Sequence, residues 1–191
     1  MVRQFKLIKY FLLFFFISTS SFALEKWTID PKKSSIQFKI DVLLNEDVKG
    51  GFQKFSGTVE VDREKFIGNT KIETDADSIF TNYDSNYKDL IRGDSFFDLK
   101  HFPKIILVAK NFYINTKDQN TISHVSLTIK GHEKEFDIPL NYIFLKNEHV
   151  ILNGSFIIHR NDFEIGSGPW SETFILKDEI KVLVNLELDK N

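Results

Sequence analysis

The sequence predicts an all-β protein, an antiparallel eight-stranded barrel with one short helical insertion. Apolar and polar residues alternate along most of the chain, which is typical of strands with one buried and one wet face. Turn signals separate these runs, and no long crossover helix recurs, which disfavours a parallel sheet. We expect the sheet to close on itself because closure removes exposed edges.

The first clear strand lies at 36–42, where Ile36, Phe38 and Ile40 share one face. The same alternation predicts further strands at 58–62, 71–76, 105–110, 125–130, 135–142, 150–158 and 179–188. About eight strands are therefore expected, which is enough for a small barrel whose interior is either filled or holds one ligand.

Glycines predict several of the turns between these strands. Gly50-Gly51 and Gly68-Asn69 are typical of antiparallel connections. Alternating runs also flank Gly131, which predicts a hairpin with this glycine in its turn.

One short helix is expected at 82–92. Apolar and aromatic residues recur there at helical spacing, Asn82 can cap the start, and Gly93 can end the segment.

Residues 1–23 predict a secretory signal peptide. Arg3, Lys6 and Lys9 precede a short apolar run, and Ser21 and Ala23 are the small residues that a signal peptidase reads. The apolar run is shorter than the roughly 20 residues of a membrane-spanning helix. We therefore expect cleavage after Ala23, a periplasmic location, no stable membrane anchor, and one mature domain of residues 24–191.

Composition excludes some classes of function. The leader has three basic and no acidic residues, so its removal changes the formal charge from -2 to -5. An acidic chain without a basic stripe is a poor nucleic-acid binder. Cysteine is absent, which excludes disulfides, thiolate metal sites and a lipidated cysteine. The 20 phenylalanines, 6 of them in the leader, must line a packed core or a cavity.

Motifs for catalysis or metal binding are weak. None of the five histidines belongs to a zinc-peptidase pattern, and Gly166-Ser167-Gly168 lacks the spacing of a nucleophile elbow. We therefore expect no catalytic residues, no metal ligands and no cofactor. Two alternatives stay open: a periplasmic enzyme acting on a lipid-like substrate through His159 or Asp162, and a structural β domain with a filled core.

Apolar side chains from many elements could converge on one interior and line a ligand cavity. The candidates are Phe38, Ile40, Val42, Phe52, Phe55, Phe80, Leu90, Phe97, Leu127, Ile129, Phe156, Ile158 and Trp170.

Four segments carry a family resemblance: GGFQKFSG at 50–57, SFFDLKHFPKI at 95–105, LTIKGHEKEFDIP at 127–139 and HRNDFEI at 159–165. In this order they resemble the YceI-like family of lipocalin-like, polyisoprenoid-binding periplasmic proteins. The resemblance implies a barrel extended around a tunnel that holds a polyprenyl chain or a prenylated quinone, with no catalytic constellation. The expected partner is an isoprenoid lipid, and a homodimer is left open.

The chain departs from this family in two places. Lys33 stands where a histidine often precedes serine, and Lys88-Asp89 and Leu90-Ile91 stand where Arg-Asp and His-Leu are common. These departures put the identity of the ligand's head group in doubt. Lys88 and Arg92 are the candidate partners of a polar or anionic head, although a solvated helix face is the commoner fate of such residues.

Overall fold

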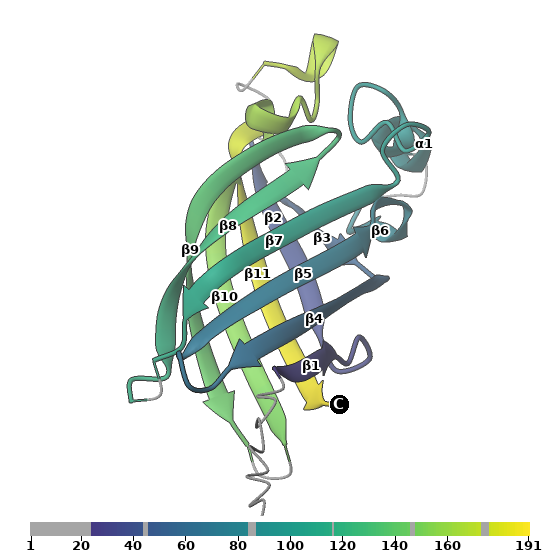
Figure 1. Ribbon diagram of the computed structural model, residues 1–191. Helices are drawn as coiled ribbons and strands as arrows, with labels where there is room; N and C mark the ends of the chain where they lie inside the picture. Colours follow the sequence, from purple (N-terminus) through teal and green to yellow (C-terminus); the bar gives the residue numbers. More distant parts are fainter. Residues whose placement is uncertain (1–23, 44–45, 84–86, 116, 146–147, 173–175) are drawn as a thin grey trace, which may run out of the picture.

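The computed structural model describes residues 24–43, 46–83, 87–115, 117–145, 148–172 and 176–191, so the expected leader lies outside the described residues. Within these ranges, eleven antiparallel strands form one sheet (Figure 1). The strands are β1 (Glu25–Ile29), β2 (Ser35–Val42), β3 (Val48–Phe52), β4 (Phe55–Asp62), β5 (Ile67–Asp75), β6 (Ile79–Thr81), β7 (Lys104–Tyr113), β8 (Asn120–Ile129), β9 (His132–Phe144), β10 (His149–His159) and β11 (Leu176–Lys190).

Eight of the strands form a closed ring. Their order is β1-β4-β5-β7-β8-β9-β10-β11, and β11 returns to β1 through pairs such as Ile29 with Leu188. The expected all-β class and closed eight-stranded antiparallel barrel are therefore confirmed.

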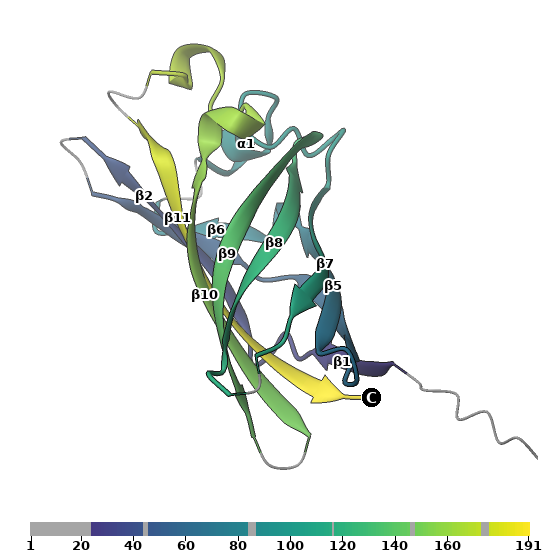
Figure 2. The same cartoon turned by 60° about the vertical axis from the view of Figure 1, so that its left-hand side comes forward.

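Strand β11 joins the ring to a second piece of sheet. Along one edge it pairs with β10 over eleven residues. On its other edge, the last residues pair with β1, whereas Leu176 and residues 180–185 pair with β2. Strands β2, β3 and β6 follow in that order and extend the wall at the end of the barrel that carries α1 (Figures 1 and 2).

The extension corrects the predicted turn at Gly50-Gly51. Both glycines lie inside β3, paired with Phe38 and Gln37 on one side and with β6 on the other. A Cβ added at Gly50 would lie 2.2 Å from the carbonyl oxygen of Phe80. Glycine is needed there because the strands approach closely, and a turn was the wrong interpretation.

Gly68-Asn69 also lies within a strand. Both residues belong to β5, where the pairing with β7 shifts register between Gly68 and Thr70. The glycine therefore accompanies a β-bulge, which sequence alone does not distinguish from a turn.

The hairpin at Gly131 is confirmed. Ile129 pairs with His132, and the two residues between them, Lys130 and Gly131, have φ angles of 50° and 77°. Two successive left-handed residues make the tight turn that suits the twist of paired strands.

The helix α1 (Lys88–Arg92) is shorter than the expected helix at 82–92, and residues 84–86 lie outside the described ranges. Gly93 ends it as expected, since its N–H donates to the carbonyls of Asp89 and Leu90. Asn82 does not cap it. Its side-chain oxygen instead accepts from the backbone N–H of Lys49 at 2.8 Å.

We predict that Gly50→Ala lowers the free energy of unfolding by about 3 kcal/mol, because the new methyl group meets backbone that cannot move aside. Urea unfolding followed by circular dichroism measures the change. The matched control is Gly93→Ala, whose Cβ would lie 3.3 Å from its nearest neighbour at an ordinary φ of -71°. Equal stability of the two variants would contradict the close packing of β3.

Candidate functional site

A cavity of about 370 Å³ lies inside the barrel. Its volume falls within the roughly 300–1,000 Å³ typical of small-molecule sites. Inward-facing residues of the strands form its wall, as on β8, where Ser123, Val125, Leu127 and Ile129 are buried and line it. None of the described residues that line it is Asp, Glu, Lys, Arg or His. The cavity suits an apolar molecule and contradicts the alternative of a filled core.

Eleven of the thirteen predicted residues line this cavity. They are Phe38, Ile40, Val42, Phe52, Leu90, Phe97, Leu127, Ile129, Phe156, Ile158 and Trp170.

Phe55 and Phe80 lie elsewhere. Phe55, the first residue of β4, is 7% exposed and packs in the core cluster of Trp27. Phe80 is the middle residue of β6 and is 44% exposed, whereas its neighbours Ile79 and Thr81 line the cavity. The period of two places Phe80 on the outer face, and a strand of three residues gave no pattern from which to see this.

Several lining residues were missed by the sequence-based list although their signal was present. Strand β11 contributes Ile180, Val182, Val184, Leu186 and Leu188, the residues that alternate on one side of the predicted strand at 179–188. The alternation in β7 likewise could have identified Ile105, Leu107 and Ala109.

Aromatic rings cluster where the cavity meets the segments around α1. Phe38 lies 6.0 Å from Phe52 between ring centroids, and Phe52 lies 6.3 Å from Phe97 in an edge-to-face arrangement. Phe96 contacts Trp170 in the same way at 5.9 Å. These pairs join β2 and β3 to the segments around residues 93–99 and 168–170, which we call the mouth of the cavity.

A buried arginine holds one side of the mouth. Arg160 is 0% exposed, and burial lowers the pKa of its guanidinium. It has no carboxylate within ion-pair distance among the described residues, and it donates instead to backbone carbonyls. Its acceptors are Ile165, Gly166, Ser171, Leu176 and Lys177. The guanidinium thus fixes the chain that carries Ile165, Trp170 and Leu176 to the cavity wall.

Backbone bonds join the two segments of the mouth. The carbonyl of Ser95 accepts from the N–H groups of Gly166 and Ser167 at 2.7 and 2.8 Å. From the barrel rim, the ammonium of Lys130 donates to the carbonyl of Glu164 at 2.9 Å. The mouth is therefore connected to the hairpin end of β8 and β9.

The two head-group candidates lie on α1 but outside the cavity wall. Arg92 pairs with Asp77, with 2.6 Å between Nε and Oδ1, and Lys88 is exposed. Between them, Leu90 and Ile91 line the cavity. The helix thus presents its apolar side inward and its charges outward.

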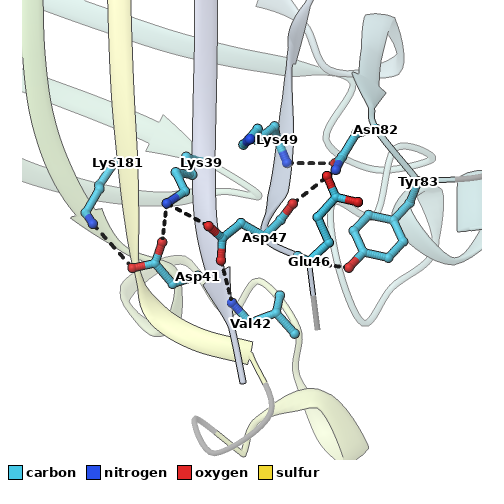
Figure 3. Close-up of polar contacts among 9 residues, drawn as sticks. All are labelled: Lys39, Asp41, Val42, Glu46, Asp47, Lys49, Asn82, Tyr83 and Lys181. Carbon is cyan, nitrogen blue, oxygen red and sulfur yellow. Dashed lines mark hydrogen bonds and ion pairs between the residues drawn. The ribbon is translucent and has the colours of Figure 1, made fainter. Parts of the chain in front are cut away.

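An ion-pair cluster covers the outer face beside the mouth (Figure 3). Lys39 lies 2.9 Å from Asp41 and 2.7 Å from Asp47, and Lys181 lies 3.3 Å from Asp41. Hydrogen bonds from Lys39 lower the pKa of both carboxyl groups. These charges are solvated, so the ion pairs contribute little to the free energy of unfolding. They mainly orient the ends of β2 and β3.

The two residues that precede β3, Glu46 and Asp47, hold the segment of Tyr83, a residue of the cavity wall (Figure 3). Its hydroxyl donates to the carbonyl of Glu46, and the side-chain amide of Asn82 donates to the carbonyl of Asp47 at 3.1 Å. Tyr83 also contacts Tyr87 edge to face. A polar contact of its hydroxyl therefore positions the ring of Tyr83 in the cavity wall.

The enzyme alternative required His159 or Asp162 at the depth of the cavity. His159 is instead exposed and lies 2.9 Å from Asp178, and Asp162 is exposed at 3.7 Å from Lys134. Neither residue lines the cavity. Within the described ranges, no three acidic or histidine side chains are grouped to hold a metal ion, and no helix is long and apolar enough to span a membrane.

Known proteins share this fold and parts of this sequence. Residues 27–188 match the family model of the YceI-like domain. UPF0312 proteins from two strains of Staphylococcus epidermidis are each 31% identical over 121 residues, which is 61% of this chain and 66% of theirs. The match thus spans slightly less than two thirds of these relatives.

Solved structures agree with the architecture. BcnA of Burkholderia cenocepacia is 26% identical with a TM-score of 0.75, covering 83% of this chain and 98% of BcnA. A polyisoprenoid-binding domain from Saccharophagus degradans is 13% identical with a TM-score of 0.70, covering 86% and 98%. The YceI protein of Campylobacter jejuni is 20% identical with a TM-score of 0.66, covering 78% and 88%.

We predict that Arg160→Met lowers the free energy of unfolding by about 3 kcal/mol, because several buried carbonyls lose their donor. Urea unfolding measures the loss. The control Arg63→Met removes an arginine whose side chain is 64% exposed and whose ion pair with Glu25 should contribute less than about 1 kcal/mol. A loss at Arg160 no larger than at Arg63 would contradict the assigned role.

A pH titration tests the polar contacts of the outer wall. A hydrogen bond from the His124 ring to the carboxylate of Asp137 raises the pKa of His124 above its ordinary value of 6.5. Protonation therefore favours the folded state: the contribution is complete below pH 6.5 and is lost as the pH rises through the raised pKa. In NMR titrations, Asp137→Asn should lower the pKa of His124, whereas Asp178→Asn should not. An unchanged pKa in Asp137→Asn would show that this pair is not formed.

Proposed function

This chain belongs to the YceI-like domain family, and we propose that it is a periplasmic carrier or reservoir that holds a polyisoprenoid amphiphile in its barrel. The ligand is a polyprenyl chain or a prenylated quinone. The observation that carries the proposal is the cavity, whose described wall is apolar or neutral throughout. The polyisoprenoid-binding name of the Saccharophagus degradans domain, a protein of the same fold, supports the choice of ligand class. The periplasmic location rests on the predicted leader.

The tail of such a ligand supplies affinity without any reaction. Each buried methylene contributes about 0.8 kcal/mol, so several isoprene units give a gross gain well above the binding free energies that non-covalent complexes generally reach. Loss of freedom in a flexible chain offsets much of this gain. Branched aliphatic side chains and aromatic rings, such as Val182, Val184 and Phe156, offer a wall of matching chemistry.

A neutral wall also selects against charge. An ionised group moved into this cavity would lose its hydration without meeting a counter-ion, which costs several kcal/mol. A ligand with a charged head must therefore leave that head outside the mouth, whereas a neutral amphiphile can enter entirely.

Native mass spectrometry of protein purified from its own host tests the proposal. The expected spectrum contains a non-covalent complex whose extra mass is that of an isoprenoid lipid. Delipidated protein should then bind an added prenyl quinone with a one-to-one ratio. Protein that is free of lipid from its host and also refuses prenyl quinones would overturn the proposal.

We predict that Phe38→Trp shortens the longest isoprenoid tail accepted, because a larger ring narrows the cavity where β2 and β3 form its wall. Binding of a series of prenyl quinones of increasing tail length measures the limit. Tyr113→Trp is the matched control, since it enlarges an aromatic ring that is 59% exposed and outside the cavity wall. An unchanged length limit in a folded Phe38→Trp protein would show that Phe38 does not contact the tail.

A further inference from the structure

One fully buried polar atom in the described cavity wall has no hydrogen-bond partner. Ser123 is 1% exposed, and its hydroxyl has no hydrogen-bond partner among the described residues. Among the described residues, the other buried side-chain oxygen without a hydrogen bond belongs to Asp41. Its carboxylate, however, forms ion pairs with Lys39 and Lys181. A buried hydroxyl without a partner costs about 1–3 kcal/mol, so its presence calls for an explanation.

The serine faces the cavity at a definite depth. It belongs to the inward-facing set of β8 with Val125, Leu127 and Ile129. It is the fourth residue of β8, which begins at the end of the barrel away from α1 and runs toward the mouth (Figure 1). Ser123 therefore belongs to the wall of the inner part of the cavity, with its hydroxyl oxygen buried just behind the surface of that wall.

The neighbouring wall is small and mildly polar. Thr70 on β5 pairs with Ala109 on β7, and Ala109 pairs with Val125 on β8. All three residues line the cavity together with Ser123. The hydroxyl of Thr70 already donates to the carbonyl of Thr58 at 2.9 Å, which leaves Ser123 as the unpaired donor of this wall.

We propose that Ser123 hydrogen bonds a neutral oxygen of the ligand, so that the amphiphile enters head first and its tail extends toward the mouth. The inference rests on the proposed function and adds the orientation of the ligand and the class of its head: an uncharged alcohol or carbonyl, including a quinone carbonyl. A charged head is excluded from this position because no described lining residue carries a counter-charge.

The mouth offers less to such a head. Arg92 is already paired with Asp77, and Lys88 lies outside the wall. Tyr83 has its hydroxyl bonded to the carbonyl of Glu46. Around them the wall is mostly aromatic and aliphatic, with Thr74 and Thr81 as further polar residues, which suits a hydrocarbon tail.

A bound water could also satisfy the hydroxyl, and matched probes separate the two sources of oxygen. Geranylgeraniol and the same hydrocarbon without its hydroxyl differ only in the proposed head. Ser123→Ala should weaken binding of the alcohol by about three- to tenfold and leave the hydrocarbon unchanged. The empty variant should be at least as stable as the original protein, since an unpaired hydroxyl is removed. Equal effects on both probes, or none on either, would overturn the proposal.

The chain supplies a matched control on the same strand. Ser126 lies on the outer face of β8, where its hydroxyl bonds the carboxylate of Glu133. Ser126→Ala removes the same group from the same strand without altering the cavity wall. Its discrimination between alcohol and hydrocarbon should equal that of the original protein.

The two tryptophans read the orientation directly. Trp27 is buried at the inner end, in a cluster with the lining residues Leu186 and Leu188, whereas Trp170 lies at the mouth. A bound quinone head quenches the fluorescence of a nearby indole. In Trp170→Phe, a short-tailed ubiquinone should strongly quench Trp27, and in Trp27→Phe it should quench Trp170 only weakly.

The outcomes separate the orientation of the ligand from the carrier function. Strong quenching of Trp170 with little effect on Trp27 would show a head at the mouth, which overturns the orientation and leaves the carrier proposal intact. Absence of quinone binding, measured by co-elution in gel filtration, would overturn the carrier proposal itself. Because Trp170 is 36% exposed, its replacement by phenylalanine should preserve the fold. If Trp27→Phe does not fold, the fluorescence of Trp27 in the Trp170→Phe variant decides the orientation.

Discussion

The site depends on the pairing of β11 with two partners along one edge. Its last residues join β1 and close the eight-stranded ring, while Leu176 and residues 180–185 join β2 and carry the wall further. An eight-stranded barrel alone is just wide enough to be filled by its own side chains. The extension of β2, β3 and β6 adds wall where the cavity opens, and the space inside it is lined by residues from both pieces of the sheet.

Much of this could be predicted because a period of two reports both strand and face. The alternation at 36–42 and 179–188 located β2 and β11 and identified the sides that line the cavity. The extension could not be recognised in the same way. Strand β3 contains two glycines, and β6 has only three residues. Gly50 permits a close approach to Phe80 that is visible only once three distant segments lie side by side.

The mouth was harder to predict because its order comes from contacts between distant segments. The carbonyls that accept from Arg160 belong to residues 165–177. They are backbone groups, so the identity of the side chains does not reveal them. A buried guanidinium bonded to carbonyls is rigid and specific, since a lysine could not satisfy as many acceptors. Charges at this end, including those of Arg92 and Lys39, lie outside the cavity wall. The apolar interior and the ordered rim therefore arise from separate sets of residues.

The proposed carrier function requires a hollow that the side chains of the barrel leave open for a lipid. A crystal structure of the protein saturated with a long-tailed prenyl quinone examines this requirement. We expect continuous electron density for the ligand between the wall of β8 and the wall of β11. Side chains collapsed into that space, with the quinone absent or bound on the outer surface, would contradict it.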